Sequence, residues 1–259
     1  MRVYPELNSG LHWTSLLIFP PHKIREVAQI VNDTPLGQKS SVHIFMMQPP
    51  PDFQPAFATS LWYAGTPEEG KAHFSSLFAA GSVAEMGPPG GVTPANILNS
   101  AADEMAKKGG RKPCVATSLE KLDPDAVERC WELFVDFLAR HPSAGESGLM
   151  FEVYDTAKVM QVPEEESAFA LRRYGVHAVG LIKYKDAALD NAAAAFGEEF
   201  RKVVREGGGM EKAKVYCNFA IGDETAEEMY GDAARIEKLK AIKAKWDPEN
   251  LFSEHHPFN

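Results

Sequence analysis

The sequence has few cysteines, and it has no long apolar run. Its three cysteines, Cys114, Cys130 and Cys217, are far apart and odd in number, which argues against a disulfide scaffold and against a four-cysteine zinc site. No stretch reaches the ~18 consecutive apolar residues that a membrane-spanning helix requires. The residues that follow Met1 form no apolar signal region. We therefore expect a soluble, cytoplasmic protein without a membrane partner.

Basic residues are also in the minority. The chain has 27 Lys and Arg residues against 36 Asp and Glu residues, which gives a formal net charge of −9. A nucleic-acid-binding protein needs a clustered basic face, whereas the basic residues here are scattered, so we expect no nucleic-acid partner. The composition is otherwise that of an ordinary globular protein, with 44% hydrophobic and 24% charged residues.

Several catalytic motifs are missing. The stretch 81–95 is rich in glycine and proline but lacks the Gly-Lys-Ser/Thr of a phosphate loop, and we interpret it as a loop. The chain contains neither the Gly-x-Ser-x-Gly of α/β-hydrolases nor the His-Glu-x-x-His of zinc proteases. The sequence therefore predicts neither a nucleotide loop nor a metal site.

The elements that are present favour one α+β domain. Apolar runs predict strands over residues 11–19, 41–47, 58–63, 149–154, 168–172 and 176–184, with a short extended piece over 215–219. Helical spacing and capping residues predict helices over residues 23–31, 66–79, 124–138, 186–205 and 232–245. Strands that follow one another closely in sequence favour hairpins. We therefore expect an antiparallel sheet of about six to seven strands backed by helices, within a single domain over residues 1–259.

The C-terminal part carries a family resemblance. It contains Tyr216-Cys-Asn218-Phe, then Tyr230-Gly231, and then Asp247-Pro-Glu-Asn-Leu-Phe252. This pattern resembles the closing segment of the berberine-bridge-enzyme-like FAD-linked oxidases. Upstream, residues 151–154 and 168–172 resemble two central strands of that family's substrate domain, and residues 10–20 resemble its first strand. The resemblance implies a substrate domain over 10–206 and a C-terminal segment over 207–259.

The resemblance does not extend to a flavin-binding domain. Members of the family carry an Arg-x-x-Gly-Gly-His segment whose histidine attaches the flavin, and no histidine of this sequence follows two glycines. We expect the chain to hold no cofactor of its own and to use FAD only if a partner chain supplies it. In the family, Tyr216 and Asn218 would lie against the flavin. We expect the face that normally packs on the flavin domain to form a homodimer instead, because a large exposed apolar patch promotes association.

Strand parity selects the first candidate residues. Side chains alternate between the two faces of a strand, so the apolar set over 149–153 should face the helices. Met150, Glu152 and Tyr154 then face the other side. A carboxylate beside a tyrosine on a partly apolar surface predicts an acid–base pair, with the pKa of Glu152 raised by desolvation. The alternative is an ordinary salt bridge between Glu152 and Arg172.

The remaining candidates would line a ligand site. His43 shares a strand face with Phe45 and Met47 and is a third catalytic candidate, although a lone histidine on an apolar strand is more often a hydrogen-bonded core residue. His177 begins a strand and has the same two interpretations. Other candidates for substrate binding are Arg172, Tyr216 and Asn218. Arg172 could bind a carboxylate or enolate or form the internal ion pair, and Tyr216 and Asn218 could instead tie the last helix to the sheet.

Three functions remain open. The first is a cofactor-independent isomerase, cyclase or lyase that acts on a small natural product by acid–base catalysis and by holding the substrate in a reactive shape. The second is the FAD-lacking subunit of a split flavin-dependent oxidase. The third is a non-catalytic protein that binds a small molecule. The first is favoured because no protein side chain replaces a hydride acceptor.

Overall fold

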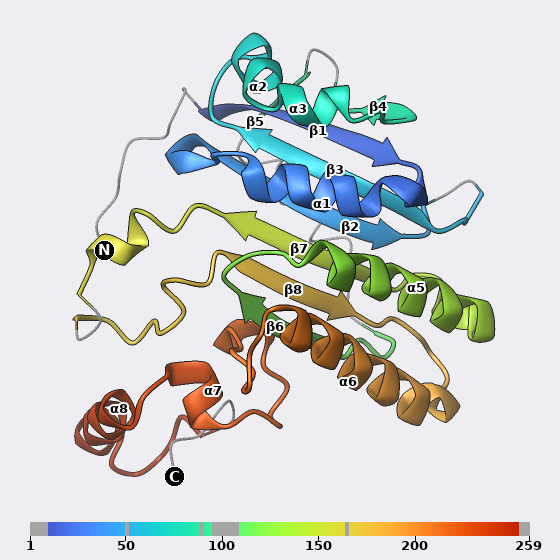
Figure 1. The fold of residues 1–259 in the computed structure, drawn as a ribbon. Helices are drawn as coiled ribbons and strands as arrows, with labels where there is room; N and C mark the ends of the chain where they lie inside the picture. Colours follow the sequence, from blue (N-terminus) through green and yellow to red (C-terminus); the bar gives the residue numbers. More distant parts are fainter. Residues whose placement is uncertain (1–9, 50–51, 89–90, 95–108, 164–165, 254–259) are drawn as a thin grey trace.

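An antiparallel sheet of eight strands forms the centre of the protein (Figure 1). The computed structural model describes residues 10–49, 52–88, 91–94, 109–163 and 166–253. The strand order is β4-β1-β3-β2-β7-β8-β6, and β5 also pairs with β1. This arrangement confirms the predicted α+β class and the antiparallel sheet. The strands are β1 Leu11–Phe19, β2 Ser40–Met47, β3 Ala56–Tyr63, β4 Ala84–Met86, β5 Val92–Pro94, β6 Cys114–Leu119, β7 Gly148–Tyr154 and β8 Val176–Leu181.

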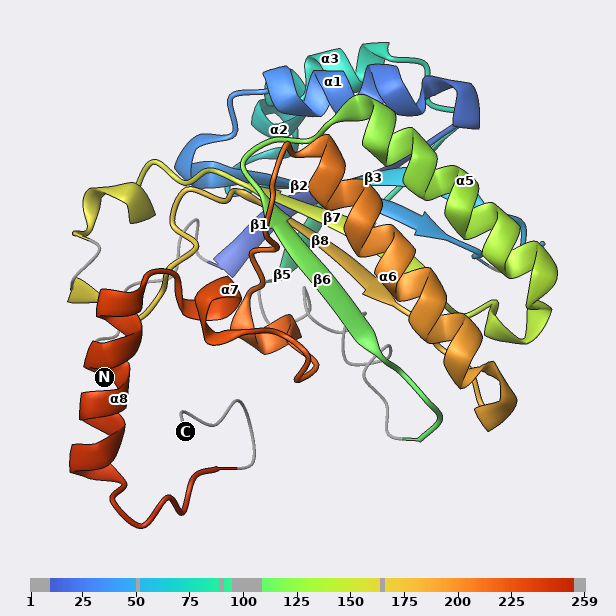
Figure 2. The same cartoon turned by 60° about the horizontal axis from the view of Figure 1, so that its bottom comes forward.

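Helices α1, α5 and α6 cover one face of this sheet (Figure 2). The core lies between the helices and the sheet, where Phe137 of α5 stacks on Phe196 of α6 with ring centroids 4.3 Å apart. Phe151 of β7 meets Phe200 of α6 at 6.2 Å. The helices are α1 Ile24–Asp33, α2 Pro67–His73, α3 Ser75–Ala79, α5 Pro124–Arg140, α6 Asp190–Gly207, α7 Ala226–Tyr230 and α8 Ala233–Trp246. Short 3₁₀ turns are η2 Pro21–Lys23, η3 Gly37–Lys39, η6 Pro142–Ala144, η7 Val159–Gln161, η9 Ala187–Leu189 and η10 Cys217–Phe219. Within the described ranges, no helix is long and apolar enough to cross a membrane.

Capping residues explain where the helices begin. Thr66 and Glu69 form a capping box at the start of α2, and Thr225 and Glu228 form another at the start of α7. Asp123 accepts a backbone N–H at the start of α5, followed by a proline in the first turn. The helix predicted over 66–79 is interrupted at Phe74, whose ring packs on Trp13 at 6.0 Å, so α2 and α3 are separate.

Several sequence predictions of strands and loops are wrong. Residues 168–172 form no strand, because the chain turns there and the Tyr174 amide donates to the Leu171 carbonyl. The stretch 81–95 contains β4 and β5, which are too short to show a periodicity. The piece predicted as extended over 215–219 ends in the 3₁₀ turn η10. Strand β6 was not predicted, because its mixture of small, polar and apolar residues does not alternate.

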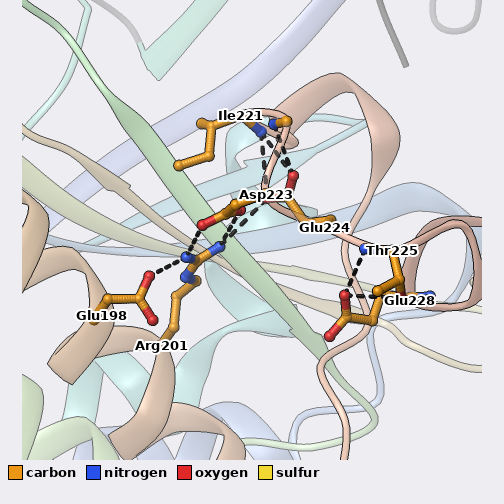
Figure 3. A network of polar contacts seen from close by, with 8 residues as sticks. Glu198, Arg201, Ile221, Asp223, Glu224, Thr225 and Glu228 are labelled. Carbon is orange, nitrogen blue, oxygen red and sulfur yellow. Dashed lines mark hydrogen bonds and ion pairs between the residues drawn. The ribbon is translucent and has the colours of Figure 1, made fainter. Parts of the chain in front are cut away.

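The C-terminal segment joins the sheet and α6 through polar contacts (Figure 3). The Ser118 amide of β6 donates to the Lys214 carbonyl at 2.6 Å. Arg201 of α6 forms ion pairs with Asp223 at 2.6 Å and with Glu224 at 3.3 Å, and it also pairs with Glu198. The carboxylate of Glu224 is only 2% exposed and accepts the amides of residues 221 and 222. A buried carboxylate bound in this way fixes the loop before α7 against α6.

We predict that Arg201→Ala loosens this attachment. The substitution leaves the buried Glu224 carboxylate without its cation, so local opening of the C-terminal segment should become about 1–2 kcal/mol easier, which corresponds to roughly 10-fold faster amide exchange. Hydrogen–deuterium exchange over residues 214–231 measures this change. The control is Lys202→Ala, which removes an exposed partner of Glu199 on the same helix. Equal exchange in the two variants would show that Arg201 does not hold the segment.

Candidate functional site

The face of the sheet opposite α1, α5 and α6, here called the second face, carries those of the predicted site residues that lie on strands. Leu149, Phe151 and Val153 of β7 are buried toward the helices, as strand parity predicts. The intervening side chains of Glu152 and Tyr154 therefore project from the second face. On β2, His43, Phe45 and Met47 alternate with the buried residues in the same way, so they share this face.

Four polar residues form one row across the second face, here called the polar row. The antiparallel register places His43 of β2 opposite Glu152 of β7, and Glu152 opposite His177 of β8. His177 is in turn opposite Ser118 of β6. Side chains that are directly opposite on neighbouring strands have Cβ atoms about 4.5–5.5 Å apart. The register therefore brings a carboxylate between two imidazoles.

Glu152 and Tyr154 form the predicted pair. The Tyr154 hydroxyl donates to Glu152 Oε2 at 3.1 Å. Burial raises the pKa of Glu152, and this hydrogen bond lowers it by a smaller amount. The pKa of Tyr154 is raised by burial and by the nearby Glu152 charge, so the hydroxyl keeps its proton at neutral pH. The pair can therefore accept a proton at Glu152 while Tyr154 remains a hydrogen-bond donor.

His43 is a neutral base on the Phe45 side of the row. Burial lowers the pKa of His43 from 6.5 to about 4. Its ring lies 5.6 Å from the Tyr154 ring, edge-on, and 6.1 Å from the Phe45 ring. Within the described part of the chain, its buried Nε2 has no hydrogen-bond partner. A buried polar atom without a partner is energetically costly, so this nitrogen has an unused capacity for a hydrogen bond.

His177 lies in the polar row between Glu152 and Ser118. Its Nδ1 is 2.8 Å from the Ser118 hydroxyl oxygen. Its ring lies between those of Tyr154, at 6.3 Å, and Tyr216, at 5.7 Å. Burial lowers the pKa of His177, so it is also neutral at neutral pH. The sequence did not point to Ser118, because β6 itself was not recognised as a strand.

An apolar row runs beside the polar row. The register aligns Phe45, Met150, Val179 and Ala116 across β2, β7, β8 and β6. Met47 follows Phe45 on the same face of β2 and is half-buried, at the margin of this row. Cys114 also lies on this face, and burial raises its pKa to about 11, so its thiol stays protonated. A ligand on the second face would meet apolar contacts along one side and acid–base groups along the other.

The C-terminal segment adds Tyr216 and Asn218 to this site. Asn218 Nδ2 donates to the Tyr216 hydroxyl oxygen at 2.9 Å. The Tyr216 ring meets Phe169 at 5.9 Å and Phe219 at 5.7 Å, both edge-on, in addition to its contact with His177. These contacts fix Tyr216 at the β8 side of the polar row. Both residues therefore lie beside the acid–base groups.

Arg172 does not belong to the polar row. The predicted ion pair between Arg172 and Glu152 is wrong, because the guanidinium instead donates to the backbone carbonyls of Val159, Val162 and Phe169 at 2.6–3.2 Å. The residue is only 3% exposed. Its position in a turn rather than in a strand next to β7 explains the difference. Among the described residues, no cluster of three or more histidine, cysteine or acidic side chains could hold a metal ion.

We predict that His43 makes the protein less stable in acid. The folded state disfavours the imidazolium, so the unfolded chain binds the proton first as the pH falls. The stability that the neutral His43 contributes is fully present above pH ~6.5 and is lost progressively down to about pH 4, by up to about 3 kcal/mol. The raised pKa of Glu152 makes the folded protein more stable as the pH falls over part of this range. The effect of His43 is therefore measured as the difference between the stability curves of the parent and of a His43 variant.

Urea unfolding between pH 4 and 7 and NMR titration of His43 both measure this effect. His43→Phe should flatten the stability curve, and the His43 resonance should titrate near pH 4. His22→Asn, at an exposed position outside the site, serves as the control and should give the parent curve. A His43 midpoint near 6.5 would contradict the burial of this imidazole.

Comparison with known protein families agrees with the C-terminal motif. The family described as "Berberine and berberine like" matches residues 215–258. The FAD-linked oxidoreductase hasG of Aspergillus fumigatus is 28% identical over 257 residues, an alignment that covers 95% of this chain and 54% of that protein. The chain therefore spans about half the length of this curated relative.

Solved structures of the same fold cover almost the whole chain. BBE-like 1 of Physcomitrella patens superposes with a TM-score of 0.71 and 12% identity over 97% of this chain and 54% of that one. A carbohydrate oxidase of Microdochium nivale gives 0.71 and 16% identity over 96% and 55%. These structures establish the fold, and the sequence matches and the C-terminal motif establish the relationship. The chain is similar to the berberine-bridge-enzyme-like FAD-linked oxidoreductases in fold over almost its whole length, and its C-terminal residues match the model of that family.

Proposed function

We propose that the second face binds a small organic substrate and that Glu152 removes a proton from it. The observation that carries this proposal is the polar row itself, in which one desolvated carboxylate stands between two neutral imidazoles. A general base works best when its pKa approaches the working pH, and burial moves the pKa of Glu152 in that direction. Tyr154 holds the carboxylate in place through its hydroxyl.

The other side chains of the face would hold the substrate. Phe45 and Met150 offer an apolar surface for its carbon skeleton, and the free Nε2 of His43 would accept a hydrogen bond from it. Tyr216 and Asn218 would contact the end of the substrate nearest β8. Binding in one fixed orientation brings the acidic C–H or O–H group to Glu152 and supplies part of the rate.

The first candidate reaction needs no redox cofactor. Once Glu152 has taken the proton, return of that proton to another atom gives an isomerase. Attack by the resulting carbanion or oxyanion within the same molecule gives a cyclase, and expulsion of a leaving group gives a lyase. The acid–base groups for all three lie in the polar row, which favours this function on a small natural product.

The second candidate is the substrate-binding half of an FAD-linked oxidoreductase. The relatives are named as such and are about twice as long as this chain, which supports a flavin-binding half on a partner chain or another part of a longer protein. Tyr216 and Asn218 fit one wall beside a flavin ring, because they are held together and lie next to the acid–base groups. A bound flavin would supply the hydride acceptor, while Glu152 would still remove the substrate proton.

Isotope exchange tests the step that both candidate reactions share, which is removal of a substrate proton by Glu152. We expect the protein in D2O without oxygen to introduce deuterium into one of a panel of small ketones and phenols, detected by mass spectrometry. Glu152→Gln should reduce the exchange at least ~100-fold, the contribution of a well-placed general base. The matched control is Glu120→Gln, because Glu120 is an exposed partner of Arg173.

The outcomes separate the candidate functions. Exchange that survives Glu152→Gln would contradict the role of Glu152. Binding of a panel compound without any exchange would instead support a non-catalytic binding protein. Product that is lighter by two hydrogens, formed only when a flavin-containing partner co-purifies, would identify the substrate-binding half of an oxidoreductase.

We also propose that the chain forms a homodimer, and that the exposed apolar residues of its C-terminal segment, rather than the face expected from the family resemblance, make the contact. Helix α8 has no buried residue. Trp246 is 75% exposed and Phe252 is 82% exposed, whereas Asp247 holds the intervening turn in place by accepting the amides of Leu251 and Phe252. An ordered turn that exposes large apolar side chains favours association.

Sedimentation velocity tests the homodimer. We expect the parent to sediment as a dimer and Trp246→Glu to shift it to a monomer, because a charge in an apolar interface is costly. The control is Lys240→Glu on the same helix, at a charged exposed position. A parent that is monomeric at all concentrations would contradict the homodimer.

A further inference from the structure

We infer that Ser118 is a positioning residue, which holds the neutral His177 in the tautomer whose Nε2–H donates to the oxygen of an enolisable carbonyl substrate. This inference rests on the proposed function of Glu152 and gives that function a substrate class. Ser118 lies on β6 at the end of the polar row, directly opposite His177.

The position of the Ser118 hydroxyl is fixed by its surroundings. The residue is only 1% exposed, and its hydroxyl oxygen is 2.8 Å from His177 Nδ1. Its backbone N–H donates to the Lys214 carbonyl, which joins β6 to the C-terminal segment. The rings of Tyr154 and Tyr216 lie against the imidazole as well. The orientation of His177 is therefore set on both sides.

Either atom of the contact between the Ser118 hydroxyl and His177 Nδ1 can be the donor, depending on the tautomer of His177, and in the arrangement that we infer the hydroxyl donates. A neutral imidazole has one N–H donor and one acceptor nitrogen, and burial keeps His177 neutral by lowering its pKa. When the Ser118 hydroxyl donates to Nδ1, the proton of the imidazole is on Nε2. The neighbouring Glu152 carboxylate favours this arrangement, because a negative charge attracts an N–H group and repels a lone pair.

In the described residues, no hydrogen bond engages Nε2 of His177, so this donor is available to a ligand. Together, Glu152 and His177 provide a base and a hydrogen-bond donor on neighbouring strands. These are the two groups that formation of an enolate requires: a base for the carbon and a donor for the oxygen. A neutral imidazole is a suitable donor, since it stabilises an oxyanion without giving up its proton.

The step balances without an oxidant. The C–H bond next to the carbonyl breaks, and its proton moves to the carboxylate of Glu152. The electron pair forms a C=C bond, the former carbonyl oxygen becomes an oxyanion, and this oxyanion accepts the hydrogen bond from His177 Nε2–H. The substrate class is therefore a small compound with a C–H group next to a ketone or aldehyde, with an apolar part that lies along Phe45 and Met150.

Removal of the Ser118 hydroxyl tests this inference without a known substrate. In Ser118→Ala, Nδ1 of His177 loses its hydrogen-bond partner, so the ring should change from one tautomer to a mixture of two. ¹⁵N-edited NMR of the ring nitrogens measures this change. The probe for the oxyanion site is 4-nitrophenol, whose phenolate oxygen resembles an enolate oxygen. Its affinity, measured from the absorbance of the bound phenolate, should fall about 10-fold, the effect of one misplaced hydrogen bond.

Thr117→Val is the matched control. Thr117 is the preceding residue on β6, is fully buried on the helix side, and has a hydroxyl without a partner among the described residues. This variant also removes one buried hydroxyl, but it should leave both the His177 tautomer and the affinity for 4-nitrophenol unchanged. A general loss of order in β6 would affect both variants, whereas a positioning role affects Ser118→Ala alone.

Two results would overturn the inference. In the first, the His177 ring of the Ser118→Ala variant keeps the tautomer of the parent. In the second, that variant binds 4-nitrophenol as tightly as the parent does. The tautomer does not depend on turnover, so it is judged separately from the proposed function. If Glu152→Gln retained deuterium exchange, the role of Glu152 would fail while the tautomer result stood.

Discussion

The antiparallel register of β2, β7, β8 and β6 is the constraint on which the site depends. Each candidate acid or base comes from a different strand, and only this register places His43, Glu152, His177 and Ser118 in one row. A shift of one residue in any strand would turn its side chain into the core under the helices. Because Phe151 and its buried neighbours are anchored on α6, the packing of the core also fixes the polar row.

The C-terminal segment contributes to the same surface from outside the sheet. It is held by the Ser118–Lys214 backbone hydrogen bond and by the ion pairs of Arg201, and it brings Tyr216 against His177. This attachment places Tyr216, which belongs to the matched family segment, beside the polar row. The same segment also exposes the side chains of Trp246 and Phe252.

Sequence patterns predicted the fold class well and the site in part. Alternation identified β2 and β7, and therefore the face that carries His43, Glu152 and Tyr154. The short strands β4 and β5 were harder to predict, because they form by pairing with β1 and are too short to show a pattern of their own. Ser118 was missed because β6 is buried on both faces and shows no alternation. Arg172 was misassigned because a turn rather than a strand surrounds it, and its buried charge is satisfied by carbonyls.

The proposed chemistry depends on one carboxylate that is desolvated between neutral imidazoles. Titration of the Glu152 side-chain carbon by ¹³C NMR tests this claim most directly, with the exposed glutamates of the same protein as internal references. We predict that Glu152 titrates at a higher pH than these glutamates, since burial outweighs its hydrogen bond from Tyr154. A midpoint at or below theirs would contradict the account, because Glu152 would then be a solvated carboxylate with no special basicity.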